Sequence, residues 1–393
     1  MKLTHVNHGS FIYETNEELL LTDPWIFSNA FQGWSQYPYP HSNLVKKIIS
    51  RNSNLSIVVI SHAHDDHLDD IFLSKLTDNV KVVIPKTNNK GFIRRVLKNG
   101  IKEKNIIEVD ENIKKVGGFS ISAIFDGSLS SEDFIFLISN NNDLVIHSND
   151  NWREYKNITL GKIKSICSKL GIINTILMSQ VGIADAYPIY YQGISANEKK
   201  TIIKDKIKFM CESVLKNCEN LDIKNGFAYA NQSIFNSNFS NLIDLDFNPY
   251  ELRENIINNY SGSILQLNPS DQIINGKFIK CQSNLESFLD YRLSNLEKSF
   301  REYCNIKNKK TLPVNFKLIQ EEINCKNSIN ILAAGNTWND ILNGRTNVEA
   351  LITGGMGIIS KPKKYNMKEE YLLLSSWAYL YQNKAIENLS INS

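Results

Sequence analysis

The chain has 393 residues, of which 44 are Lys or Arg and 41 are Asp or Glu, so its formal net charge is only +3. This balance argues against the strong global field typical of proteins that bind nucleic acid or anionic membranes. Hydrophobic residues make up 42% and charged residues 22% of the chain, which excludes a disordered chain, a collagen-like fibre and a coiled coil. A chain of this length predicts two domains, or one large domain with an extension.

No targeting or membrane segment is visible in the sequence. The N-terminus leads into polar residues instead of the apolar stretch of a secretory signal. The longest apolar runs, such as residues 56–60 and 372–374, are far too short for a membrane-spanning helix. We therefore expect a cytoplasmic protein that binds neither membrane nor nucleic acid.

The first half of the chain alternates short apolar runs with polar turns. Residues 10–13 and 19–21 are predicted to be the arms of an early hairpin, and residues 68–76 and 91–97 have the apolar spacing of short helices. Apolar runs typical of strands follow in chain order at residues 55–60, 80–84, 106–109, 119–124, 134–138, 144–147 and 173–178.

A long helix is predicted at residues 195–215, with Ser195 as its N-cap. Beyond it, residues 285–303 have the pattern of a charged amphipathic helix, and residues 331–334 and 348–354 are short apolar segments. The sequence therefore predicts an α/β core over residues 1–275 and a smaller C-terminal α+β extension over residues 276–393.

One short stretch carries most of the chemistry. His62, His64, Asp66 and His67 follow directly after the strand predicted at residues 55–60. On an extended strand end, residues two apart project to the same side, so His62 and His64 face one point. The turn into the next helix can fold Asp66 and His67 back towards it. The alternative is a surface loop that is histidine-rich by chance.

Three imidazoles and a carboxylate within six residues suit Zn²⁺, Fe²⁺ or Mn²⁺. Two adjacent sites can form, with His62 and His64 at one ion and Asp66 and His67 at the other. This donor set predicts a metal centre with one or two ions.

The pattern H-x-H-x-D-H at residues 62–67 resembles the metal-binding signature of the metallo-β-lactamase fold superfamily. The segments at residues 7–11 and 21–25 resemble the G-H-x-S-F and L-T-D-P-W segments of its lactonase and phospholipase-D branches, with Asn7 in place of the first glycine. The resemblance implies a four-layer αββα sandwich. It also implies that Asp150, after the strand at residues 144–147, is an aspartate that bridges two ions.

A closer resemblance is to the metallo-β-lactamase part of the CMP-N-acetylneuraminate and UDP-N-acetylmuramate hydroxylases. It is carried by Asp23-Pro24-Trp25, by Phe31-Gln32-Gly33-Trp34, and by residues 335–342 with 354–365. Those hydroxylases also carry a Rieske cluster, which needs short pairs of Cys and His. In this sequence no Cys precedes residue 167 and no His follows residue 147, so redox chemistry would need electrons from a separate donor, the substrate or a reductant.

Later histidine ligands of the superfamily are replaced in this chain. Asp126 and Gln180 stand in their places. Asp126 is either an oxygen ligand or a turn residue, and Gln180 is expected to be a pocket residue beside an open metal position. His147 is a ligand, a donor to a ligating carboxylate, or a buried core histidine. His8 is expected to orient ligands or substrate.

We therefore name two overlapping sets of site residues. The metal ligands are expected among His62, His64, Asp66, His67, Asp126, Asp150 and His147. The catalytic candidates are Asp66, His8 and Gln180. The neighbouring Asp65 is expected to be solvated.

Three functions remain open from the sequence. The first is an iron-dependent oxygenase, with one or two Fe ions, that hydroxylates or oxidatively rearranges a small polar metabolite; carboxylate-rich ligation favours Fe or Mn over Zn. The second is a hydrolase that uses a hydroxide on a metal ion to attack a lactone, amide or phosphodiester. The third is a metal-binding structural protein without activity.

Overall fold

The computed structural model describes residues 1–281 and three later strands. Gaps in the first range lie at residues 32–33, 37–39, 51–52, 88–89, 127–133, 183–186, 190, 192, 231–232 and 236–248. The later strands are β18 (Thr311–Asn315), β19 (Asn330–Ala334) and β20 (Gly357–Ser360), which form a three-stranded antiparallel sheet. The helix expected at residues 285–303 and the segment at 348–354 lie outside the described residues.

The first large sheet has eight strands in the order β17-β16-β1-β2-β3-β5-β6-β7. The strands β1, β2 and β3 pair antiparallel, and β3, β5, β6 and β7 pair parallel. Their bounds are β1 (Lys2–Asn7), β2 (Ser10–Glu14), β3 (Leu19–Thr22), β5 (Leu55–Val59), β6 (Lys81–Pro85), β7 (Ile106–Val109), β16 (Gln272–Ile274) and β17 (Lys277–Ile279). The antiparallel pair β2–β3 confirms the predicted hairpin.

The second large sheet repeats this plan with seven strands in the order β15-β13-β12-β11-β10-β9-β8. An antiparallel half, β8 to β11, is again followed by a parallel half, β11, β12, β13 and β15. Their bounds are β8 (Lys114–Val116), β9 (Phe119–Phe125), β10 (Phe134–Asn140), β11 (Asp143–His147), β12 (Asn174–Gln180), β13 (Gly226–Tyr229) and β15 (Ile264–Gln266).

Alternating side chains divide the core into three layers. Successive residues of a strand point to opposite faces. Accordingly, Ile57 and Val59 of β5 pack between the two sheets with Val145 of β11, whereas Val58 lies in the outer layer of the first sheet and Ile146 in the outer layer of the second. Both sheets are therefore buried on both faces.

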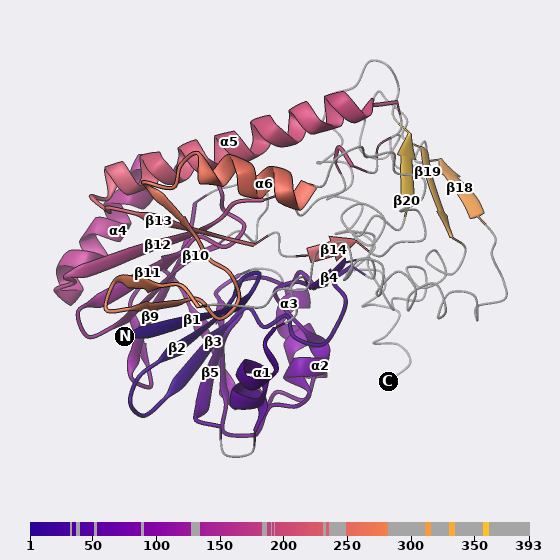
Figure 1. Cartoon of the computed structure of the whole chain (residues 1–393). Coiled ribbons are helices and arrows are strands. Elements are labelled where there is room, and N and C mark those ends of the chain that lie inside the picture. Colours follow the sequence, from indigo (N-terminus) through magenta and orange to yellow (C-terminus); the bar gives the residue numbers. More distant parts are fainter. Residues whose placement is uncertain are drawn as a thin grey trace.

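Helices cover the two outer faces (Figure 1). The first sheet is covered by α1 (Ser42–Ile49), α2 (Asp70–Leu73) and α3 (Lys90–Lys98), and the second by α4 (Asn157–Leu170), α5 (Ala196–Asn220) and α6 (Pro249–Asn258). A capping box at Ser195 and Glu198 begins α5, which confirms the predicted N-cap. The expected four-layer αββα sandwich is thus confirmed.

Two further features complete the described chain. The short strands β4 (Trp34–Gln36) and β14 (Ser233–Phe235) form an antiparallel pair, and a 3₁₀ turn lies at Glu103–Asn105. The boundary predicted between residues 275 and 276 falls in the turn that joins β16 to β17, so the first sheet continues to Ile279. Across the described part of the chain, none of the helices combines the length and the apolar character needed to cross a bilayer.

Gly226 shows how tightly α5 packs against the second sheet, and Gly161 in α4 provides a comparison. A Cβ added at Gly226 in β13 would lie 2.4 Å from Cγ1 of the buried Val214 and 3.2 Å from Sγ of Cys218, both on α5. In contrast, a Cβ at Gly161 in α4 would meet no described atom within 4 Å. We expect Gly226→Ala to cost about 1–3 kcal/mol through overpacking.

Gly161→Ala is the matched substitution, and it is expected to stabilise the protein by about 0.5–1 kcal/mol because alanine favours a helix interior. Urea unfolding followed by circular dichroism measures both effects. Equal midpoints for the two variants would contradict the packing of α5 against β13.

Candidate metal centre

The predicted site residues lie where central strands of both sheets end. In the first sheet, β1 runs in the same direction as β3 and β5, so the turn after β1 lies at the same edge as the carboxyl ends of β3 and β5. In the second sheet, β9 runs in the same direction as β11 and β12, so the carboxyl ends of these three strands also lie together. The residues at these ends are His8, Asp23, the segment 61–69, Asp126, Asp150 and Gln180.

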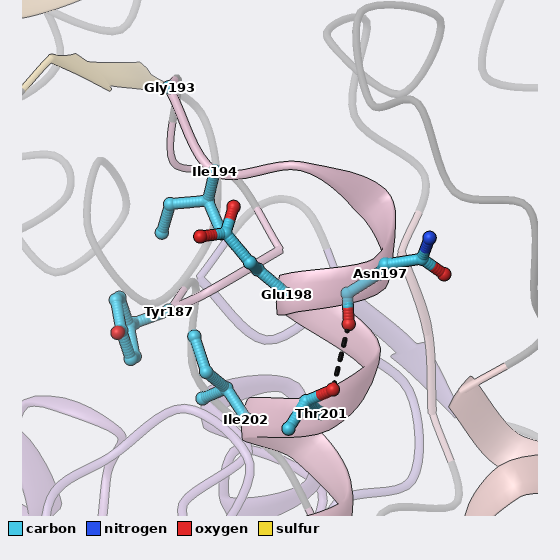
Figure 2. Close-up of a pocket in the computed structure, with 7 residues that line it drawn as sticks. All are labelled: Tyr187, Gly193, Ile194, Asn197, Glu198, Thr201 and Ile202. Carbon is cyan, nitrogen blue, oxygen red and sulfur yellow. Dashed lines mark hydrogen bonds between the residues drawn. The ribbon is translucent and has the colours of Figure 1, made fainter.

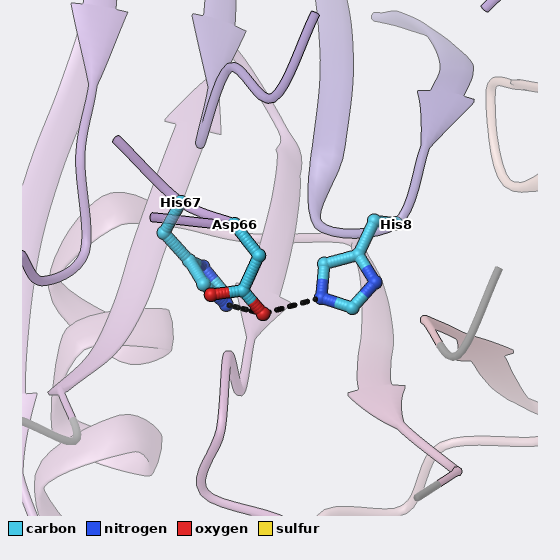
Figure 3. A group of neighbouring side chains, drawn as sticks. All are labelled: His8, Asp66 and His67. Atoms are coloured by element: carbon cyan, nitrogen blue, oxygen red, sulfur yellow. Dashed lines mark hydrogen bonds and ion pairs between the residues drawn. The ribbon is translucent and has the colours of Figure 1, made fainter. Parts of the chain in front are cut away.

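The first group of possible ligands is His8, Asp66 and His67 (Figure 3). All three side chains are buried. Oδ2 of Asp66 lies 3.1 Å from Nε2 of His8 and 3.8 Å from Nε2 of His67. His8 has a positive φ of 41° in the tight turn after β1, which directs its ring towards Asp66 across the site. Two imidazole nitrogens and a carboxylate oxygen thus converge on one point.

The second group is His62, His64 and Asp150. Nε2 of His62 lies 2.8 Å from Nδ1 of His64, and Oδ2 of Asp150 lies 3.4 Å from the first nitrogen and 3.9 Å from the second. The side chains of His64 and Asp150 are 29% and 25% exposed, whereas His62 is buried. This group is therefore the one with access to solvent.

Asp150 also joins the two groups. Its Oδ1 lies 3.2 Å from Nε2 of His67, while its Oδ2 faces His62. The two carboxylate oxygens thus point to different groups, which is the geometry that a bridging carboxylate needs.

Ser61 and Asp23 orient the histidine rings. Oδ2 of Asp23 lies 3.0 Å from Nδ1 of His67, and Asp23 itself accepts hydrogen bonds from the amide and the hydroxyl of Ser61 at 2.7 and 2.9 Å. The Ser61 hydroxyl also lies 2.9 Å from Nδ1 of His62. Because both rings are held at Nδ1, their Nε2 atoms face Asp150, as in metal sites where a carboxylate fixes the ring of a ligating histidine.

The charges in the site favour a cation. Burial alone would raise the pKa of Asp66, but His67 and His8 outweigh it and hold that pKa below its ordinary value. Burial alone would lower the pKa of His67, but Asp150, Asp66 and Asp23 raise it well above its ordinary value. The convergent carboxylates therefore keep a positive charge among them even without a metal ion.

The residues present fit a transition-metal ion. Oδ1 of Asp66 is buried and forms no hydrogen bond with any described residue, although Asp66 belongs to the first group. Buried polar atoms without a partner are costly, and an ion would satisfy them. Mixed imidazole and carboxylate donors suit Fe, Mn or Zn.

Asp126 and His147 were also expected as ligands, but they lie outside both groups. The carboxylate of Asp126 accepts a hydrogen bond from the hydroxyl of Thr159 at the start of α4. His147 is buried against the rings of Phe11 and Tyr229, and burial lowers its pKa to about 4. Their roles as ligands stay predictions.

Gln180 ends β12 and is buried, and its Oε1 finds no hydrogen-bond partner among the described residues. Its role beside the metal position also stays a prediction.

The expectation for Asp65 is wrong. Its Oδ2 accepts a hydrogen bond from the amide of Phe31 at 3.0 Å, and its Oδ1 lies 2.9 Å from Nη2 of Arg95 on α3. Its side chain is 23% exposed. The sequence contains no local signal for this pair, because the partners lie on different elements.

A separate hollow lies at the start of α5 and has a volume of about 500 Å³ (Figure 2). Its lining is formed by Tyr187, Gly193, Ile194, Asn197, Glu198, Thr201 and Ile202. Two of its polar groups serve the helix: the Thr201 hydroxyl donates to the Asn197 carbonyl at 3.0 Å, and Glu198 belongs to the capping box.

Part of this chain is similar to known proteins. Residues 2–154, which contain both candidate groups, match the family model described as a beta-lactamase superfamily domain. The cytidine monophosphate-N-acetylneuraminic acid hydroxylase of Xenopus laevis is 26% identical over 126 residues, which are 29% of this chain and 20% of the relative. The chain thus spans about a fifth of the length of that relative.

Other similar proteins are named as hydrolases. A metal-dependent hydrolase of Rhizobium etli is 26% identical over 190 residues, which are 46% of this chain and 71% of the relative. Among solved structures, a metallo hydrolase of the archaeon Ignicoccus hospitalis is similar with a TM-score of 0.42 and 14% identity, over 72% of this chain and 99% of that one.

Proposed function

We propose that the protein is a metal-dependent enzyme with two adjacent ions, and the match of residues 2–154 to the family model of a beta-lactamase superfamily domain supports this proposal. His8, Asp66 and His67 would hold one ion, and His62, His64 and Asp150 the other. The observation that carries the proposal is the convergence of these donors around a shared Asp150.

At a finer level, we propose an iron-dependent oxygenase that acts on a small polar metabolite. Carboxylates contribute to both groups, and such donor sets favour Fe or Mn more than an all-imidazole set does. The likeness to the Xenopus hydroxylase supports this choice. When bound, iron would supply the activation of O₂, with electrons from a separate donor or a reductant.

The chain's own residues would prepare the site for this chemistry. Asp23 and Ser61 hold the Nδ1 atoms of His67 and His62, which leaves the opposite nitrogens of both rings available to bind ions. Exposed parts of His64 and Asp150 leave the second group open to a substrate from solvent. The unpartnered Oε1 of Gln180 lies at the end of β12, where it could orient a polar substrate group.

A metal-dependent hydrolase is the second candidate. The Rhizobium protein named as a hydrolase aligns over 46% of this chain, a longer stretch than the Xenopus hydroxylase does. A zinc-loaded site of the same donors would act on a lactone, amide or phosphodiester.

Metal content and O₂ dependence separate the candidates. Protein purified without oxygen is expected to carry iron, and its iron-loaded form with ascorbate is expected to consume O₂, whereas His62→Ala is not. If the zinc form instead cleaves nitrophenyl esters or bis-nitrophenyl phosphate without O₂, and the iron form consumes none, the hydrolase proposal replaces the oxygenase. If the protein binds neither ion, both proposals are wrong.

A further inference from the structure

The guanidinium of Arg95 holds the loop that carries four of the candidate ligands. Its Nη1 donates to the Ala63 carbonyl at 2.6 Å, and its Nη2 donates to the Leu68 carbonyl at 3.2 Å. Its Nε and Nη2 also donate to the Asp70 carboxylate at 3.0 and 3.1 Å, and Nη2 lies 2.9 Å from Oδ1 of Asp65. One side chain on α3 therefore contacts the loop at four residues.

Two of these contacts lie between neighbouring ligands. Ala63 separates His62 from His64, and Asp65 separates His64 from Asp66. Rotation of the backbone at either intervening residue would turn one ligand relative to the next. The remaining contacts are to Leu68, which directly follows His67, and to Asp70, the first residue of α2. The guanidinium thus restrains the points at which the ligand directions are set.

Other hydrogen bonds hold the two ends of this loop, where Ser61 bonds Asp23 and Asp69 bonds the turn after β3. Within the loop, the carbonyl of His64 accepts from the amides of His67 and Leu68 at 3.1 and 2.8 Å, and regular helix begins only at Asp70. A planar guanidinium can bond several acceptors in fixed directions, which a lysine ammonium cannot do. The position therefore calls for arginine in particular.

We propose that Arg95 is a positioning residue of the metal centre, which holds His62, His64 and Asp66 towards their ions through the backbone between them. The inference rests on the proposed function, because it requires that ions bind there. It predicts that loss of the guanidinium weakens metal binding although Arg95 belongs to neither ligand group.

Equilibrium dialysis with Co²⁺ and Mn²⁺ tests the inference. We expect Arg95→Ala to weaken binding about 10–100-fold, which is the usual range for a residue that supports a ligand. Arg95→Lys is expected to lie between the alanine variant and the unaltered protein. The visible absorption spectrum of bound Co²⁺ should change as well, because it reports ligand geometry.

Arg94→Ala is the matched control. Arg94 precedes Arg95 on the same helix but is exposed, so this variant removes the same charge without touching the loop. It is expected to keep the original affinity and spectrum. If it weakens binding as much as Arg95→Ala does, the effect is one of net charge and the inference is wrong.

Two further outcomes decide the matter. If Arg95→Ala does not fold, Arg95→Lys and Asp65→Asn replace it in the test. Unaltered Co²⁺ affinity and an unaltered spectrum in both variants would overturn the inference about Arg95 and leave the proposed function in place. If the unaltered protein binds neither Co²⁺ nor Mn²⁺, the proposed function fails, and the inference fails with it.

Discussion

Replacing Asp150 with alanine is expected to weaken metal binding at both groups by more than about 100-fold, because even residues that only support a ligand change affinity 10–100-fold. The two oxygens of Asp150 face His67 of the first group and His62 of the second, at 3.2 and 3.4 Å. In contrast, His64→Ala removes a donor from the second group only. We therefore expect that variant to retain one ion per chain.

Metal analysis after dialysis measures the number of ions in each variant. Asp143→Asn is a suitable control, because Asp143 begins the same strand, β11, and pairs with the N-terminal amine at 2.7 Å instead of the site. It is expected to retain both ions. Two ions bound to Asp150→Ala, or the loss of the same single ion as in His64→Ala, would contradict a bridging position for Asp150.

The sequence predicts the candidate site where the geometry is local. The donors at residues 62–67 lie within six positions after a buried strand, so their convergence follows from strand and turn geometry alone. Asp150 was expected only through the resemblance, because it comes from the opposite sheet. Whether it faces both groups depends on how the two sheets pack, and this packing has no local signature.

Contacts between distant segments also explain where the predicted elements fail. A helix was predicted at residues 68–76, but α2 covers only Asp70–Leu73. Arg95 bonds the carbonyl of Leu68, and the amide of Asp69 donates to the carbonyl of Pro24 at 3.2 Å, so both residues are held in the loop. Tertiary hydrogen bonds thus override the helical apolar spacing there.

Several elements were not predicted from the sequence, and α4 and β1 are two whose sequences carry weak signals. The helix α4 has no side-chain cap at Lys156 and contains Gly161, a poor helix former. The strand β1 buries Thr4, His5 and Asn7, so the alternation of apolar and polar residues is lost. Both elements are stabilised mainly by packing against their neighbours in the fold.

Asp69 is the buried residue that connects the ligand loop to the turn after β3. It is 0% exposed, and its Oδ2 accepts hydrogen bonds from the amides of Ile26, Phe27 and Ser28 at 2.9, 2.5 and 3.1 Å. Its Oδ1 accepts from the amide of Phe72 at 3.1 Å and so caps α2. One carboxylate therefore satisfies four backbone donors, of which those of Ile26 and Phe72 are buried.

Asp69→Ala is expected to lower the free energy of unfolding by about 3–5 kcal/mol, because a buried donor left without a partner costs about 1–3 kcal/mol and hydrogen bonds to a charged group are the stronger ones. Asp69→Asn keeps an oxygen that can accept part of the set, so its loss should be smaller. Urea unfolding of the metal-free protein measures both variants. Asp78→Ala is the control, because it removes only an exposed ion pair with Lys102, which contributes little to stability. A midpoint for Asp69→Ala equal to that of the control would show that the turn at residues 26–28 does not depend on this carboxylate.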